Sequence, residues 1–322
     1  MTQPLNYTPK AIEALLSYPC PGAPGTAAAM QYLAGKLREA QVFVLSDHGE
    51  LLDRSKPRPQ FPGLMLKPPF PVMALEYTAQ RATGGDDHYT GASCTKRIAL
   101  VWEWTADLPA LHRVAFGPLD LGPGVVIASL AFYDDQQLWM PVAAAMHLPF
   151  DALWMEEDAE IAPFARAMLE AGRITKEQLL SPRLAGTAIP LLLEPLLQMS
   201  MALGGMSAAL DTVASDVSDE VAAYIDLCSA LACKNVGTRA TAAPDKLNRQ
   251  RIKAGKVPLK GFHVLELASG VNLPGQGGIG DRSGPRSHLR RGHIRRLPGE
   301  RVTWVNSAIV RGRGFVDKVY AA

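Results

Sequence analysis

Cysteine and long apolar runs are scarce in this 322-residue chain. The four cysteines, Cys20, Cys94, Cys228 and Cys233, are too few and too scattered for a disulfide framework, so reduced and mostly buried thiols are expected. No apolar run is long enough to span a bilayer. The first residues lack the basic and apolar regions of a signal peptide. These absences favour a cytoplasmic protein that makes no membrane contact.

Sequence motifs for common cofactors are also missing. There is no phosphate-binding loop, no glycine fingerprint for dinucleotides after a strand, and no Gly-x-Ser-x-Gly elbow. Asp86, Asp87 and His88 are metal-ligand types, but adjacent side chains diverge and no further ligand is spaced to join them. A solvated loop is the better interpretation of these three residues. We therefore expect neither a cofactor nor a metal site.

The net charge of +2 conceals a strong asymmetry along the chain. Residues 234–322 contain 18 Lys/Arg and 5 Asp/Glu, a net charge of +13, whereas residues 1–233 contain 15 and 26, a net charge of −11. An acidic body with a basic terminal region predicts an anionic partner. The alternative is that the two parts neutralise each other within one fold or an oligomer.

Residue patterns predict an α+β fold with a mixed or antiparallel sheet covered by helices. Two helices are expected within residues 8–40, and four strands follow, each rich in β-branched or aromatic residues. These strands are Gln41–Leu45, Val72–Tyr77, Arg97–Trp104 and Val125–Phe132. Together they define an acidic α+β unit over residues 1–135.

The middle of the chain, residues 136–233, is predicted to be helical. Asp151–Ala171 has an aspartate cap and a terminal glycine. Ala188–Met206 is almost wholly apolar, which predicts a buried helix kinked or split at Pro195. Asp211–Ala232 has the periodicity of a further amphipathic helix.

Residues 234–322 form the basic, β-rich C-terminal module of this prediction. A short helix is expected over Lys246–Ala254, with Lys246, Arg249 and Lys253 on one face. Such a face suits phosphate contacts and equally suits a solvated surface helix. A strand follows at Gly261–Ala268. The module either stands alone or packs back onto the first sheet.

The stretch Ser287–Val310 predicts a β-hairpin with its turn at Leu297–Glu300 and a second strand, Arg301–Val310, apolar enough to be central. Because strand residues alternate between faces, Arg291, His293 and Arg295 share one face. Arginine forks and a histidine suit phosphate recognition. The predicted nucleic-acid contacts are Lys246, Arg249, Lys253, Arg290, Arg291, His293, Arg295 and Arg296.

An enzymatic alternative uses His288 and His293 for metal-independent cleavage of nucleic acid, with an arginine on the phosphate. These histidines lie on opposite faces of an uninterrupted strand, so the alternative requires a bend or bulge at Gly292. A second alternative assigns the arginines to ion pairs with the acidic body.

The C-terminal segment resembles a module of uncharacterised proteins from tailed phages and mobile elements. The similarity covers roughly the last 90 residues and is carried by Lys246–Arg251, Gly255–Leu259, His263–Leu265, His288–Arg296 and Val302–Asn306. The resemblance implies a phage-encoded origin, with the host cytoplasm as location, and no particular activity. We therefore expect a nucleic-acid-binding protein. A further alternative is an adaptor for a host protein, with the proline-rich Lys67–Pro71 or the acidic predicted helix Asp151–Ala171 as its surface.

Overall fold

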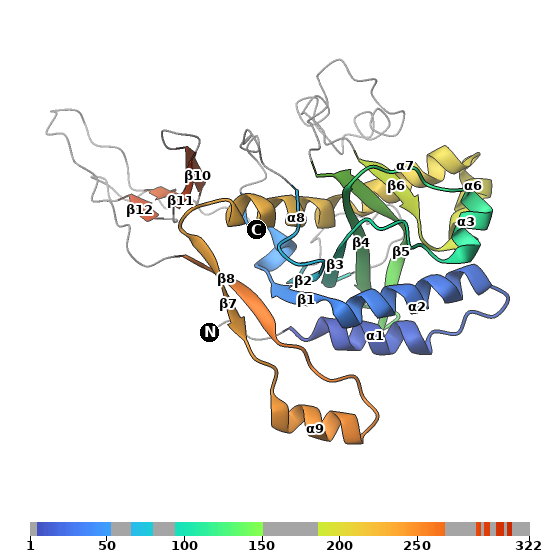
Figure 1. The fold of residues 1–322 in the computed structure, drawn as a ribbon, viewed down its shortest axis with the longest axis horizontal. Coiled ribbons are helices and arrows are strands. Elements are labelled where there is room, and N and C mark those ends of the chain that lie inside the picture. The colour runs from blue at the N-terminus through green and yellow to red at the C-terminus, as the bar shows by residue number, and fades with distance from the viewer. Residues whose placement is uncertain are drawn as a thin grey trace, which may run out of the picture.

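The structure is a computed structural model that describes residues 5–52, 66–79, 94–150, 186–267, 288–290, 293–296, 301–305 and 308–310. Its centre is an eight-stranded sheet in the order β6-β5-β4-β3-β2-β1-β8-β7 (Figure 1). The strands are β1 (Gln41–Val44), β2 (Val72–Thr78), β3 (Lys96–Glu103), β4 (Gly124–Tyr133), β5 (Leu138–Pro149), β6 (Thr187–Pro190), β7 (Val236–Thr241) and β8 (Phe262–Leu267). The predicted α+β class is confirmed.

The sheet is mixed, because it contains both parallel and antiparallel pairs of strands. β1 runs parallel to both of its neighbours, β2 and β8, and every other pair is antiparallel. β3 and β4 are buried almost throughout, as is expected of strands covered on both faces. The core of the protein therefore lies along these central strands.

Helices cover both faces of the sheet. Consecutive residues of β2 point to opposite faces: Glu76 contacts Thr8 of α1 (Tyr7–Ser17), and Tyr77 contacts Glu220 of α8 (Ser218–Leu231). α1 and α8 therefore lie on opposite sides. α2 (Pro24–Glu39) packs beside α1 (Figure 1). The other helical elements that precede β7 are η1 (Asp47–Gly49), α3 (Ala110–Phe116), α6 (Leu193–Leu203) and α7 (Met206–Asp216).

Two glutamates cap the first helices from distant parts of the chain. The Glu76 carboxylate accepts a hydrogen bond from the Thr8 backbone N–H at 2.7 Å. Glu194 accepts from the backbone N–H groups of Gly25 and Thr26 at 2.8 and 2.7 Å. Burial alone would raise the pKa of Glu194, but hydrogen bonds from the Thr26 hydroxyl and from these two N–H groups outweigh it and lower that pKa. Each carboxylate satisfies N–H groups that have no partner within the helix and lies at the positive end of the helix dipole.

The helical prediction for the middle of the chain is wrong at its beginning. Leu138–Pro149 is the strand β5, which pairs with β4 through an irregularity near Ser129 and with β6 on its other side. The alanines and methionines of β5 are good helix formers, but pairing and burial between two strands override that local preference. The predicted helix Asp151–Ala171 lies outside the described residues.

The apolar segment Ala188–Met206 also differs from its prediction. It begins in β6, and α6 starts only at Leu193, so that Pro195 falls in the first turn, where proline is tolerated. Only Leu196 of α6 is buried, whereas Met201 is 78% exposed. The predicted helix Asp211–Ala232 is divided at Val217 between α7 and α8. No helix in the part of the chain that the structure describes is both long and apolar enough to cross a membrane.

The C-terminal module joins the first sheet. β8 pairs in parallel with β1, with Val42 opposite Phe262 and Phe43 opposite His263. β7 then pairs with β8 and forms one edge of the sheet. Strands from all three predicted segments therefore share one sheet. β7 and β8 of the C-terminal module pack back onto the first sheet and do not form a separate unit.

Candidate nucleic-acid interface

The region Val236–Leu267, called here the basic arm, consists of β7, α9 (Asp245–Lys253) and β8. β7 and β8 are antiparallel neighbours from Val236 opposite Leu267 to Thr241 opposite Phe262, and α9 lies in the connection between them. Figure 1 shows α9 beyond the end of these strands, apart from the helices that cover the sheet. The arm contains seven Lys/Arg and two Asp/Glu, so its net charge is +5.

Polar contacts hold one side of α9. The Arg251 guanidinium donates to Glu13 of α1 at 3.0 Å and to the Val257 carbonyl at 2.8 Å. Asn248 exchanges two hydrogen bonds with the backbone of Leu259, at 2.8 and 2.7 Å. These contacts fix the direction of a helix that has no buried residue. The predicted helix Lys246–Ala254 is confirmed, with bounds shifted by one residue.

The opposite side of α9 carries exposed positive charge. At 3.6 residues per turn, Lys246, Arg249 and Lys253 lie on the face away from Asn248 and Arg251. All three side chains are exposed, and none forms a hydrogen bond or ion pair with another residue in the described ranges. Their ammonium and guanidinium groups are therefore available to phosphate oxygens.

Three other basic groups of the arm, those of Arg239, Arg251 and Lys260, are used within the fold. Arg239 forms an ion pair with Glu266 across the β7–β8 ladder. The Lys260 ammonium donates to the carbonyls of Arg38 and Ala40 at the end of α2, both at 2.6 Å, and burial lowers its pKa. For these residues, and for Arg251 with Glu13, the alternative of structural pairing applies.

The predicted hairpin near the C-terminus is confirmed in the pairing of the two strands on either side of its turn, but its first strand is shorter than predicted. β10 (His293–Arg296) pairs with β11 (Val302–Val305) in antiparallel register, from Arg296 opposite Val302 to His293 opposite Val305. The predicted second strand, Arg301–Val310, is wrong, because its two ends pair with different strands: β11 pairs with β10 only through Val305. β12 (Ala308–Val310) pairs instead with β9 (His288–Arg290). Each pair forms its own two-stranded sheet.

The two histidines of the enzymatic alternative lie on different strands. His288 belongs to β9 and His293 to β10, which are in separate sheets. Gly292, where that alternative requires a bend or bulge, lies outside the described residues. The Arg295 side chain is exposed. Arg291 and the side chains of His288, Arg290, His293 and Arg296 lie outside the described residues. Cleavage by these histidines therefore stays a prediction from the sequence.

The structure separates the predicted contact residues into two groups. β11 lies near the beginning of β7, because the Lys234 backbone N–H donates to the Val302 carbonyl at 3.1 Å and the Thr303 hydroxyl donates to the Asn235 side-chain oxygen at 2.9 Å. α9 follows the other end of β7, after Thr241. The six residues of that strand span about 17 Å. The predicted face of α9 therefore lies toward one end of β7, and the predicted contacts on β10, which pairs with β11, lie toward the other.

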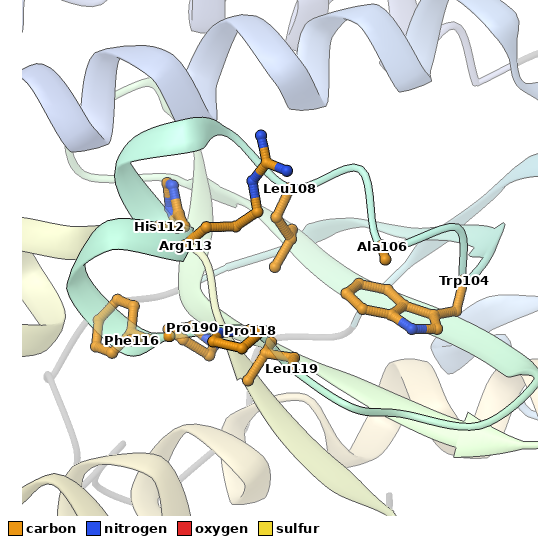
Figure 2. A pocket seen from close by; sticks show the side chains of 10 residues that line it. Trp104, Ala106, Leu108, His112, Arg113, Phe116, Pro118, Leu119 and Pro190 are labelled. Carbon is orange, nitrogen blue, oxygen red and sulfur yellow. The ribbon is translucent and has the colours of Figure 1, made fainter.

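An apolar pocket of about 210 Å³ lies away from the basic arm, beside α3 (Figure 2). Trp104, Leu108, Phe116 and Leu119 line it, and His112 of α3 hydrogen-bonds the Leu191 carbonyl. The other ionisable residue that lines the pocket is Arg113, whose guanidinium stays protonated, so the lining residues provide no acid–base pair. Among the described residues, no group of three or more His, Cys, Asp or Glu side chains could hold a metal ion.

Sequence reasoning did not find the buried ionic cluster between α8 and the sheet. The Arg97 guanidinium donates to both carboxylate oxygens of Glu220, at 2.8 and 3.3 Å, and the Tyr77 hydroxyl donates to the same carboxylate at 2.8 Å. Glu220 is fully buried. Arg97 and Tyr77 stand opposite each other on β3 and β2, a pairing that only the sheet register reveals. This cluster holds α8 against the sheet.

Asp216, at the end of α7, makes stability depend on pH. Burial raises its pKa from 3.8 to about 6; Arg97 opposes the shift and Glu220 adds to it. Because the folded pKa lies above the unfolded one, the folded state loses stability through this group as pH rises from 3.8 to 6. Asp216→Asn should therefore become more stable relative to wild type over this range, by about 1 kcal/mol after allowance for solvent screening. Urea unfolding of both proteins across the range measures the difference, and a constant difference would contradict the prediction.

Comparison with protein-family models, curated proteins and solved structures finds no match to this chain.

Proposed function

We propose that the protein binds nucleic acid through its phosphate backbone, with α9 of the basic arm as a principal contact surface. The observation that supports this is the exposed face of Lys246, Arg249 and Lys253, on a helix whose other side is tied to the body by Arg251 and Asn248. A helix that only needed to be solvated would not require such fixed placement. Phosphate contacts are made by side chains of this kind, presented at a fixed spacing.

The second group of predicted contacts belongs to the same proposal. Arg295 of β10 is exposed, and Arg290, Arg291, His293 and Arg296 are its neighbours in sequence. A strand of nucleic acid that follows β7 would meet α9 at one end and this group at the other. The resemblance of the C-terminal segment to phage and mobile-element proteins adds the proposal that the chain is encoded by such an element.

Fluorescence anisotropy with labelled DNA and RNA at two or more salt concentrations tests the proposal. We expect the logarithm of the affinity to fall linearly with the logarithm of the salt concentration, because each phosphate contact releases counterions. Gel analysis of the recovered probe also tests whether it is cut. Binding that is absent, or that does not respond to salt, would overturn the proposal.

A further inference from the structure

A hollow of about 360 Å³ lies at the base of the basic arm. Its walls are mostly apolar and come from Pro244, Leu247, Leu259, Phe262 and Val264. The volume falls in the range of about 300–1,000 Å³ that is typical of sites for small organic groups. The hollow adjoins the α9 surface, since Leu247 belongs to that helix and follows Lys246 directly.

The hollow exists because helices cover only part of this face of the sheet. Val42 and Phe262 are paired across β1 and β8, and both line the narrow space against α1 together with Pro9. Val264 lies on the same face of the sheet as Phe262. α1 begins only at Tyr7, and Asn6, the residue before it, forms a wall of the hollow. Since α9 buries none of its own residues, it bounds the hollow without filling it.

Charge surrounds this apolar floor. Arg239 and Lys260 line the hollow and hold their positions through Glu266 and the end of α2. On α9, Leu247 lies about 100° around the helix from Lys246. A flexible chain with a phosphate at Lys246 can therefore direct an attached apolar, flat group into the hollow.

We propose that this hollow accepts an unstacked base, so that the arm prefers single-stranded nucleic acid to a duplex. The inference rests on the proposed function and adds the form of nucleic acid that is bound. Proteins that bind single strands combine a positive track for the backbone with apolar surface for the bases. In a duplex the bases are paired and stacked, and they cannot leave the helix without an energetic cost.

Three probes of equal length separate backbone contacts from base contacts. They are a thymidine strand, an abasic strand with the same phosphates, and a duplex, all measured by fluorescence anisotropy at one salt concentration; a uridine RNA strand extends the series to RNA. We expect the thymidine strand to bind at least about fivefold more tightly than the abasic strand, which is the smallest effect expected of one contact to a base. The duplex should also bind more weakly than the thymidine strand.

Leu247→Ala and Ile252→Ala form a matched pair of variants. Both residues are exposed aliphatic side chains of α9, at 45% and 61%, and only Leu247 lines the hollow. Leu247→Ala should weaken binding of the thymidine strand about three- to tenfold and leave the abasic strand unchanged, whereas Ile252→Ala should change neither. Salt-sensitive binding without preference for the thymidine strand would overturn this inference and leave the proposed function in place. Absence of binding to every probe would overturn both.

Discussion

The triple variant Lys246→Ala/Arg249→Ala/Lys253→Ala is expected to weaken nucleic-acid binding by tenfold or more at moderate salt. The three side chains are exposed on one face of α9 and make no contact that the fold needs. If each contacts one phosphate, the slope of log affinity against log salt should become shallower by about 2.7 for duplex DNA and about 2.1 for a single strand. Anisotropy titrations over a series of salt concentrations measure both quantities.

A matched control removes the same number of charges elsewhere. Arg38, Lys67 and Arg113 are also exposed, and their side chains form no ion pair with the other residues described. Their triple alanine variant lowers net charge equally, so a general electrostatic attraction would lose affinity in both variants. Equal losses would contradict a local contact surface on α9, and a loss confined to the arm variant would support it.

The parts of the fold that the sequence predicted are those fixed by local chemistry. The strands β1 to β4 follow from β-branched and aromatic runs between turn residues. The helix α9 follows from its spacing and from Gly255 after it, and the pairing of β10 with β11 follows from the Leu297–Glu300 turn signal. In each case the signal and the structure lie within a few residues of each other.

The parts that could not be predicted depend on residues far apart in sequence. β5 is a strand because β4 and β6 pair with it, although its alanines favour a helix locally. The direction of α9 depends on Glu13, which lies 238 residues before Arg251. The hollow beneath α9 needs both the beginning of α1 at Tyr7 and the parallel pairing of β1 with β8. No local sequence pattern encodes contacts between residues so far apart in the chain. The basic face of α9 could therefore be predicted from the sequence, and the hollow could not.

Glu220→Leu is expected to destabilise the protein by about 3–5 kcal/mol, the largest stability effect predicted for a single side chain in this structure. The substitution leaves the Arg97 guanidinium, whose side chain is only 18% exposed, without its carboxylate. It also removes the acceptor of the buried Tyr77 hydroxyl. An uncompensated buried cation costs far more than the pair itself contributes. The midpoint of urea unfolding should fall, with the slope of the transition unchanged.

The double variant Arg97→Met/Glu220→Leu shows whether that cost arises from the unpaired charge. Replacing both partners with apolar groups of similar size removes the uncompensated cation, so the double variant should be more stable than Glu220→Leu alone. The half-exposed pair Arg239–Glu266, with side chains 50% and 54% exposed, provides a comparison, since its loss in Glu266→Ala should cost only about 0.2–1 kcal/mol. If Glu220→Leu costs no more than Glu266→Ala, the buried pair does not hold α8 on the sheet. If the loss of stability in the double variant equals the sum of the losses in Arg97→Met and Glu220→Leu, packing around α8 is responsible and the unpaired charge is not.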